Sequence, residues 1–569
     1  MTPDSPKQNR LKTYRFTVSG TTCEQCAASI EDNLHHIEGV QAKVSFETEI
    51  AQVSAVEAVS RDLLITAIEV AGFKVTGEDL EDCSSTKSAS SDDNGLEGNH
   101  IKENQPLHVA IIGSGSGAFA AAIKAAEQGA KVTIIEASDV IGGCCVNVGC
   151  VPSKIMIRSA HLAQHQRHNP FPGIADHVPE IDRKLLAQQQ QSRVDELRAA
   201  KYESILASNP SLTLVKGFAT FKNNNMLVVT QKDGSTSELA ADRILIATGS
   251  KPFIPLIEGI DSVPYWTSTE ALFAEKLPEH LVIVGSSVVA VELAQAYQRL
   301  GTQVTLLARH TLLYSEDPAL GESLQQAFEA EGMTVLTHTQ AHSVTFENEQ
   351  FELLLNNGKL TCDQLLIAAG RRPNTEQLNL DNTNVETDKL GAVIVDANLR
   401  TTQENIFAAG DCSTMPQFVY VAAAAGTRAA INMTGGNAEL DLSTMPAVIF
   451  TDPQVATVGL TEGEANAKGI KTVSRHLDLK NVPRALANYE TQGFLKLVVN
   501  DETQKLIGAQ ILAENAGEMI QTAVLAIHNQ MTIDALASQL FPYLTMVEGI
   551  KLCAQTFAKD VSQLSCCAG

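Results

Sequence analysis

The sequence has few features that would attach it to a membrane or a nucleic acid. None of its apolar runs approaches the roughly 20 residues that a membrane-spanning helix needs. Its first twelve residues, MTPDSPKQNRLK, are polar and lack the apolar core of a secretion signal. Basic residues are scarce: 42 lysines and arginines face 66 acidic residues, for a net charge of −24. Since nonspecific nucleic-acid binding needs a basic surface, we expect a cytoplasmic protein that neither binds nucleic acid nor inserts into a membrane.

The eleven cysteines are unevenly distributed along the 569 residues. Seven of them stand in three close groups, which are Cys23 and Cys26, then Cys144, Cys145 and Cys150, then Cys566 and Cys567. In a large cytoplasmic enzyme, close cysteines indicate metal binding or redox catalysis rather than a disulfide framework. We expect the four isolated cysteines to be buried small hydrophobic residues or inert surface thiols; these are Cys83, Cys362, Cys412 and Cys553.

The pattern of apolar residues divides the chain into several domains. Residues 11–78 alternate in the order βαββαβ, which predicts a small ferredoxin-like domain. Residues 79–106 are rich in serine, aspartate and glycine, which predicts a flexible linker. From residue 107 strands and helices alternate, which is typical of doubly wound α/β domains. The stretch 446–569 has a mixed α+β pattern and ends in the last cysteine pair.

A first dinucleotide-binding motif follows the predicted strand 108–112. Gly113 permits a tight turn, Gly115 lets a pyrophosphate approach the backbone, and Ala118 allows the next helix to pack closely. The N-terminus of that helix presents free N–H groups to the phosphates. The second strand, 131–135, ends in Glu136, where a ribose-binding carboxylate is expected.

A second motif of this kind follows the predicted strand 281–284. Its glycine pattern is relaxed, because Gly285 is followed by Ser287 and Ala290. After the next strand the chain has Arg309 instead of a carboxylate, which favours the 2′-phosphate of NADPH over NAD. The alternative is that Arg309 is a surface residue with no role in cofactor binding.

The redox chemistry is predicted to lie between these two motifs. Cys145 and Cys150 form a C-x4-C pair in a glycine-flanked loop, and helical residues follow Cys150. A helix N-terminus lowers the pKa of a thiol and so favours the reactive thiolate. The alternative is a structural disulfide, which is disfavoured because a disulfide that closes such a short loop would stabilise the fold little.

From about residue 107 to 569 the sequence resembles the flavin disulfide reductases. The likeness rests on the first glycine motif, C-x4-C-x-P-S-K, A-T-G, G-R-x-P-N and A-A-G-D. It implies an FAD-binding domain (107–252 and 372–445), an NADPH-binding domain (253–371) and a dimerisation domain (446–569), with active sites shared in a homodimer. It also implies that Cys150 contacts the flavin and that Cys145 exchanges with substrate. Further implied cofactor-site residues are Lys154, paired with Glu292, then Thr248, Gly249, Gly410 and Asp411.

Within that family the sequence is similar to the mercuric reductases. Disulfide reductases carry a histidine five residues before a glutamate (H-x4-E) as general acid, whereas here Tyr543 precedes Glu548 at that spacing. The tail pair Cys566 and Cys567 is a further likeness, and the resemblance implies that Tyr265 and Tyr543 line a metal site. Hg(II) is a soft ion that prefers thiolates. The implied substrate is therefore an Hg(II)–thiol complex, passed by the tail to Cys145 and Cys150, with a mercury-transport protein upstream.

The N-terminal pair, Cys23 and Cys26, lies between a predicted strand and helix. It resembles the metal-binding loop of heavy-metal-associated domains, with Thr22 in place of the usual methionine. The alternative is a thioredoxin-like redox pair, which the βαββαβ order disfavours.

Two features and two rival functions stay open at this point. Cys144 stands where the family usually has threonine, and the sequence does not decide its role. His161 and His165 have the i, i+4 spacing of a metal pair, but we expect them to face solvent. The rivals are a general disulfide reductase of the lipoamide or glutathione type and a metal-trafficking protein with a vestigial flavin domain.

Overall fold

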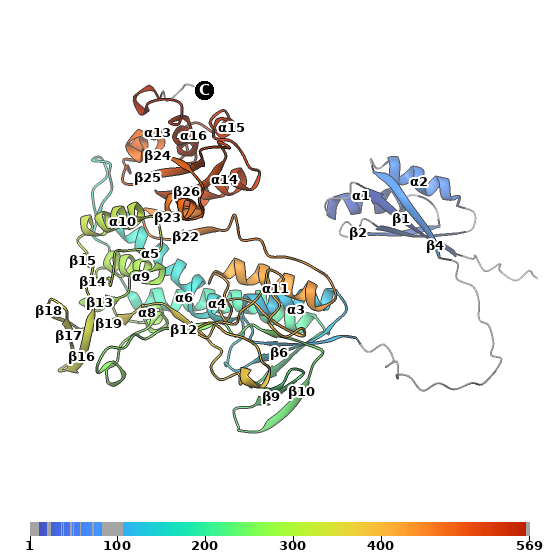
Figure 1. Ribbon diagram of the computed structural model, residues 1–569, viewed down its shortest axis with the longest axis horizontal. Helices are drawn as coiled ribbons and strands as arrows, with labels where there is room; N and C mark the ends of the chain where they lie inside the picture. The colour runs from blue at the N-terminus through green and yellow to red at the C-terminus, as the bar shows by residue number, and fades with distance from the viewer. Residues whose placement is uncertain are drawn as a thin grey trace, which may run out of the picture. The chain divides into compact units, whose positions relative to one another are not determined.

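The computed structural model describes residues 106–564 and, nearer the N-terminus, 11–19, 24–35, 37, 39–45, 48, 50–56, 59–70 and 73–81. The chain divides into two compact units, Met1–Lys102 and Glu103–Gly569, each with its own core (Figure 1). Within the described ranges, no helix combines the length and apolar character that a bilayer crossing requires.

The N-terminal unit is the expected βαββαβ domain. Its antiparallel sheet has the order β2-β3-β1-β4, and its core includes the fully buried Phe16, Ile30 and Leu64. β4 continues to Glu81, three residues beyond the expected end of this domain, because it pairs with β1 over that length. The elements are β1 (Leu11–Ser19), α1 (Glu24–His35), β2 (Val40–Ser45), β3 (Ile50–Val56), α2 (Arg61–Val70) and β4 (Lys74–Glu81).

The larger unit begins with a parallel five-stranded sheet of order β21-β11-β5-β6-β7. Helices α3 (Ser116–Glu127) and α11 (Val419–Met433) pack on it side by side (Figure 1). They approach so closely that a Cβ on Gly426 would be 2.0 Å from the carbonyl oxygen of Gly117. The strands are β5 (His108–Ile112), β6 (Lys131–Glu136), β7 (Leu212–Lys216), β11 (Arg243–Ile246) and β21 (Ile406–Ala408).

A second parallel sheet, of order β15-β14-β13-β19, is inserted between β11 and β21. The short pair β12 (Ser250–Pro252) and β20 (Arg371–Pro373) joins the chain where it enters and leaves this insertion. Helix α9 (Val288–Leu300) packs on the second sheet. The strands are β13 (His280–Val284), β14 (Gln303–Leu307), β15 (Thr334–Leu336) and β19 (Gln364–Ile367). The prediction of doubly wound α/β domains is thus confirmed for both nucleotide-binding domains.

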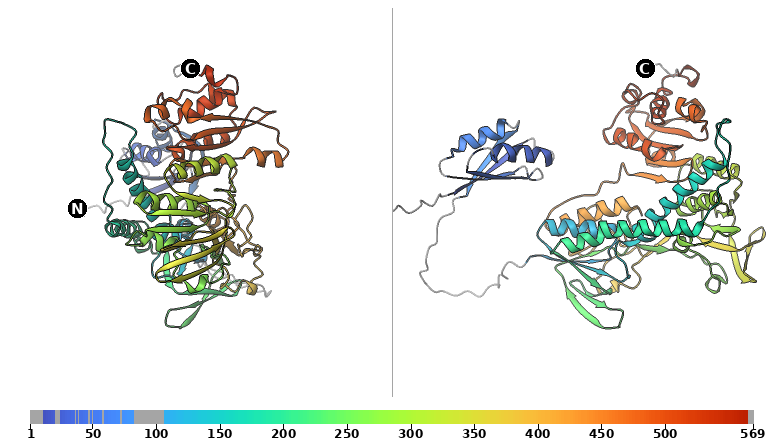
Figure 2. Two further views of the ribbon diagram at one scale, coloured as in Figure 1. Left: turned by 90° about the vertical axis from the view of Figure 1, so that its left-hand side faces the viewer. Right: turned by 180° about the vertical axis from the view of Figure 1, so that it is seen from behind.

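The last domain contains an antiparallel sheet of order β22-β23-β26-β25-β24, covered by helices (Figure 2). Its strands are β22 (Pro446–Ile449), β23 (Gln454–Gly459), β24 (Thr472–Asp478), β25 (Phe494–Asn500) and β26 (Leu506–Ala513). Its longer helices are α14 (Ala516–His528) and α16 (Glu548–Gln555), with the short α15 (Ile533–Ala537) between them. This is the predicted α+β domain.

A buried group of charges joins α9 to the start of the last domain. Arg299, whose side chain is 5% exposed, donates through Nη1 to Asp452 Oδ2 at 2.8 Å and through Nε to Glu331 Oε2 at 2.8 Å. One turn earlier, Gln295 donates through Nε2 to the Asp452 carbonyl at 2.7 Å and accepts from its N–H at 2.8 Å. We call these four residues the Arg299 clamp, because they fix the last domain against the second sheet.

Candidate active site

The first glycine turn has the geometry of a pyrophosphate site. Gly113 has φ +107°, and a Cβ there would lie 2.3 Å from the Ala247 carbonyl oxygen. α3 starts after Gly115 with no side-chain cap, so its first N–H groups are available to phosphate. Glu136 ends β6 and accepts a 2.5 Å hydrogen bond from Ser114 Oγ. These residues fit an FAD nucleotide because Gly113 and Gly115 let the phosphates approach the backbone and Glu136 keeps a carboxylate at the strand end.

The cysteine cluster lies on two helices, not in the open loop that the glycines suggested. Cys144 and Cys145 belong to the short helix α4 (Gly143–Val148), and Cys150 is the first residue of α5 (Cys150–Arg167). Gly149 breaks the backbone between them, with φ −131° and ψ −112°. The expectation that Cys150 stands at a helix N-terminus is confirmed.

The two thiols of the pair are electrostatically unequal. The thiols of Cys144, Cys145 and Cys150 are all free. The hydrogen bond from Cys145 and the charge of Lys154 together outweigh the effect of burial and lower the pKa of Cys150 to about 7. The same hydrogen bond, together with burial, raises the pKa of Cys145 well above its ordinary value. Near neutral pH the pair therefore holds one proton on Cys145 and a large thiolate fraction on Cys150.

Lys154 is held at the meeting point of three domains. Its Nζ donates to Glu292 Oε2 at 2.7 Å and lies 4.5 Å from the ring centroid of Phe450. The other carboxylate oxygen of Glu292 accepts from the Phe450 N–H at 2.9 Å. The expected Lys154–Glu292 pair therefore forms, and Phe450 is a member that the sequence did not indicate.

Asp411 is tied to the cysteine cluster by a chain of hydrogen bonds. Ser250 Oγ donates to Asp411 Oδ2 at 2.8 Å and accepts from Arg371 Nε at 2.7 Å. Arg371 Nη2 also reaches Cys144 Sγ, at 3.6 Å. Desolvation by the surrounding protein raises the pKa of Cys144, although part of the residue stays exposed, and the charge of Arg371 opposes that effect. Arg371 was not among the predicted site residues, although it stands in the G-R-x-P-N motif, whose basic residue was the available signal.

The remaining residues predicted for the FAD site follow two neighbouring strands. Thr248 and Gly249 come after β11, and Gly410 comes before Asp411 after β21. Both glycines have positive φ, +67° at Gly249 and +83° at Gly410. Since β11 and β21 are parallel neighbours, these two turns lie at the same edge of the first sheet.

The second glycine turn repeats this geometry on the second sheet. Gly285 has φ +143°, and a Cβ there would lie 2.2 Å from the Ala368 carbonyl oxygen. Ser287 precedes α9 without capping it, and Ala290 is fully buried. Arg309 is exposed beyond β14 and has no ion pair among the described residues. The turn thus fits the phosphates of NADPH, with a free cation near the expected 2′-phosphate.

The two predicted tyrosines lie in different domains of the larger unit. Tyr265 packs on the apolar cluster of the second nucleotide domain, three residues before α8 (Ser268–Phe273). Tyr543 is 54% exposed in the segment between α15 and α16. In Figure 1 the labels of α15 and α16 lie in the last domain, away from that of α4.

Several predicted thiols lie outside the described residues. Cys23, Cys83, Cys566 and Cys567 belong to this set, and Cys26 is described only as part of the backbone of α1. The other isolated cysteines, Cys362, Cys412 and Cys553, are buried as expected. In the described part of the chain, no three or more His, Cys, Asp or Glu side chains are grouped to hold a metal ion.

One expectation about the histidines is wrong. His161 does not face solvent: it is partly buried beside the Arg299 clamp. Burial lowers the pKa of His161 to about 4, and the charge of Arg299 acts in the same direction. His165, one turn later, is exposed as expected.

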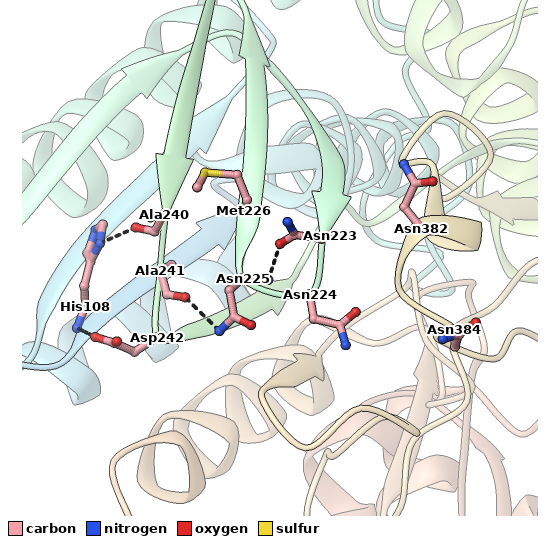
Figure 3. Close-up of a pocket in the computed structure, with 10 residues that line it drawn as sticks. All are labelled: His108, Asn223, Asn224, Asn225, Met226, Ala240, Ala241, Asp242, Asn382 and Asn384. Atoms are coloured by element: carbon pink, nitrogen blue, oxygen red, sulfur yellow. Dashed lines mark hydrogen bonds between the residues drawn. The ribbon is translucent and has the colours of Figure 1, made fainter. Parts of the chain in front are cut away.

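A cavity of about 830 Å³ opens elsewhere on the first nucleotide domain (Figure 3). Asparagines dominate its lining, which includes Asn223, Asn224, Asn225, Asn382 and Asn384. It contains none of the predicted site residues. His108 at its edge is already used, with Nδ1 bonded to the Ala240 carbonyl and Nε2 to Thr133 Oγ1.

Solved structures share the architecture of the larger unit. It is similar to the HOCl-induced flavoprotein disulfide reductase RclA from Escherichia coli, with TM-score 0.71, 28% identity, and coverage of 79% of this chain and 99% of that one. It is also similar to LpdA from Mycobacterium tuberculosis, with TM-score 0.72, 28% identity, and coverage of 80% and 100%.

Family models match almost the whole chain. The model described as Pyridine nucleotide-disulphide oxidoreductase matches residues 107–426, its dimerisation domain matches 445–554, and the Heavy-metal-associated domain matches 15–74. The structure agrees with these matches, because it has two dinucleotide-binding sheets and a cysteine pair between their glycine motifs. The chain is therefore a pyridine nucleotide-disulphide oxidoreductase with FAD and NADPH as cofactors.

Curated relatives narrow this class. Mercuric reductase of Shewanella putrefaciens is 60% identical over 97% of this chain and 100% of that protein. Mercuric reductase of Shigella flexneri is 55% identical over 97% and 99%. The chain belongs to the mercuric reductase family.

Proposed function

We propose that this protein reduces Hg(II) to Hg(0), with electrons that pass from NADPH by way of FAD to Cys145 and Cys150. The reaction, Hg(II) + NADPH → Hg(0) + NADP⁺ + H⁺, balances both charge and the two electrons. FAD, when bound, supplies the two-electron carrier between nicotinamide and thiols. The proposal is supported by 60% identity to a mercuric reductase over nearly the full chain.

The cysteine pair is suited to holding a soft cation. Cys150 offers a thiolate near neutral pH, and soft thiolates are preferred ligands of soft metal ions. A second bond to Cys145 releases the proton that this thiol holds, since metal binding displaces thiol protons. Lys154, fixed by Glu292, keeps a positive charge near the thiolate.

The observation that favours Hg(II) over a disulfide as the electron acceptor is the absence of the general-acid histidine. A disulfide reductase needs a general acid to protonate its leaving thiol, and Tyr543 stands in that place. The Glu548 carboxylate, which would otherwise orient a histidine, accepts the N–H of Leu544 at 3.2 Å. Reducing bound Hg(II) leaves no thiol that must be protonated in the same step, so the loss is tolerable.

We further propose that the active site is shared between two chains. The match to a dimerisation domain over residues 445–554 supports a homodimer. In it, Tyr543 of one chain would face Tyr265 and the Cys145–Cys150 pair of the other. Cys566 and Cys567 would deliver Hg(II) to that pair.

The N-terminal module would collect the metal upstream. Cys23 and Cys26 would take Hg(II) from a mercury-transport protein and hold it as a thiolate complex in the cytoplasm. Its match to the heavy-metal-associated domain supports this role.

One assay separates this function from its rivals. Oxidation of NADPH by the purified protein is followed with excess small thiol and with Hg(II), oxidised glutathione or lipoamide as acceptor. We expect turnover with Hg(II) alone, and loss of it in Cys145→Ala and Cys150→Ala proteins that still bind FAD. Turnover with a disulfide but not with Hg(II) would refute the proposal, and no turnover with any acceptor would favour a trafficking protein.

A further inference from the structure

Cys144 is the one thiol of the cluster that the proposed reaction does not use. It is exposed and free in the structure. Its Sγ lies 3.2 Å from where a Cβ of Gly149 would be, so it packs beside the backbone that leads into Cys150. Arg371 Nη2, at 3.6 Å, is its polar partner.

Three parts of the flavin site surround Cys144. On one side Gly143 touches the first glycine turn, since its Cβ would lie 2.6 Å from the Gly115 Cα. On another side, Arg371 connects Cys144 through Ser250 to Asp411. On the third side is Cys150. Cys144 therefore lies between the pyrophosphate turn and the thiol that serves the flavin ring.

A flavin nucleotide must cross this stretch. If its pyrophosphate binds at the glycine turn and its ring reaches Cys150, the part between them extends over the residues that separate these points. We therefore expect bound FAD to cover the exposed surface of Cys144.

We propose that Cys144 is a flavin-site thiol whose access to Hg(II) is controlled by FAD. Bound FAD shields it, so it takes no part in the mercury path. In the apoprotein it reacts with a mercury–thiol complex, Cys144–SH + Hg(SR)₂ → Cys144–S–Hg–SR + RSH, and the bound metal then blocks the return of FAD. One S–H and one Hg–S bond break, and one Hg–S and one S–H bond form, with no change in oxidation state. This inference concerns the cofactor site and is independent of whether Hg(II) is the electron acceptor.

The shielding is tested by labelling full-length protein with a maleimide, with and without FAD. The Cys145–Cys150 pair is first oxidised to its disulfide, so that neither thiol competes. Peptide mass spectrometry then gives the labelling rate of Cys144. With FAD at 100 times its Kd, we expect labelling to slow about 100-fold, because only the FAD-free fraction reacts. Equal rates with and without FAD would overturn the proposal.

Buried Cys362, in the second nucleotide domain, is the internal control. It should label slowly in both states. If FAD protected Cys362 as strongly as Cys144, the effect would report general loosening of the apoprotein, and the proposal would also fail.

The blocking step is tested on the same oxidised apoprotein with Hg(II)–glutathione in excess over its free thiols. FAD uptake, measured by quenching of flavin fluorescence, should fall in the wild-type protein and return after excess dithiothreitol. The Cys144→Thr variant retains every other thiol and should take up FAD equally with and without Hg(II). Equal inhibition of both proteins would refute the blocking role. If the variant fails to fold, labelling of the wild-type protein still decides the shielding.

Discussion

Replacing Arg299 by methionine should loosen the contact between the second nucleotide domain and the last domain. Methionine keeps much of the apolar packing but leaves Glu331 and Asp452 without their cation. Removing one partner of a buried ion pair costs about 3–5 kcal/mol. Because the side chain of Asp452 is 29% exposed, we expect the lower end, about 3 kcal/mol. At 1.36 kcal/mol per factor of ten, this corresponds to roughly 150-fold faster local opening.

Hydrogen exchange with mass spectrometry measures this opening in the full-length protein. The N–H groups of Phe450 and Asp452 are the reporters, since they donate to side chains of α9 at 2.9 and 2.8 Å. The matched control is Lys359→Met, which breaks an ion pair whose side chains are 64% and 47% exposed and which should change stability by about 0–1 kcal/mol. Equal exchange at residues 450–454 in the two variants would refute the reasoning.

The pH dependence of this contact has a definite sign. Burial tends to raise the pKa of Asp452, but the charge and hydrogen bond of Arg299, together with the charges of His161 and His165, outweigh burial, so the net pKa lies below its usual value. A carboxyl with a depressed pKa contributes stability above its unfolded pKa, about 4, and that stability is lost as pH falls through the folded pKa. Wild-type protection should therefore decline in acid. In Arg299→Met, Asp452 stays buried but loses the largest of the effects that lower its pKa, so protonation in acid should protect these amides rather than expose them.

Three further predictions concern the cofactor and redox residues. Gly143→Ala should abolish FAD binding, measured as flavin per purified chain, because its Cβ would lie 2.6 Å from the Gly115 Cα at a φ of +66°. Arg309→Leu should raise the KM for NADPH roughly 10–100-fold and leave that for NADH unchanged, since a hydrogen bond to a charged group is worth about 1.5–3 kcal/mol. In the reduced apoprotein, the Cys150 thiolate should form as pH rises through about 7. Lys154→Met should raise that midpoint, as followed by ultraviolet thiolate absorbance.

Each of these has a clear contrary result. Normal flavin content in Gly143→Ala would mean that the two glycine backbones can separate without loss of the site. An unchanged KM for NADPH in Arg309→Leu would leave the arginine as a surface residue. A constant thiolate midpoint in Lys154→Met would show that the ammonium does not act on the thiol.

The parts of the fold with local signals could be predicted from the sequence. Gly113 and Gly285 each follow a buried strand and precede a helix, and both have the positive φ that such a turn requires. The βαββαβ unit was equally predictable, because its alternation and its helix periodicity lie within short windows. The start of α5 at Cys150 could also be predicted from the neighbouring residues alone.

Contacts between distant segments could not be predicted in this way. Cys144 and Arg371 are 227 residues apart, and nothing near either one indicates the other. The environment of His161 depends likewise on Arg299 and Asp452, which come from two other domains. Helix α4 was missed because its glycines at 142, 143 and 149 are typical of a loop.

The insertion of one sheet into another imposes an order on synthesis. When residue 371 has left the ribosome, every strand of the NADPH-binding sheet is present. The FAD-binding sheet still lacks its edge strand β21 (Ile406–Ala408), and α3 still lacks α11, whose Gly426 fits directly against Gly117. We therefore expect the growing chain to become competent for nicotinamide before flavin, and a chain that stops short of α11 to carry a finished dinucleotide domain but no flavin.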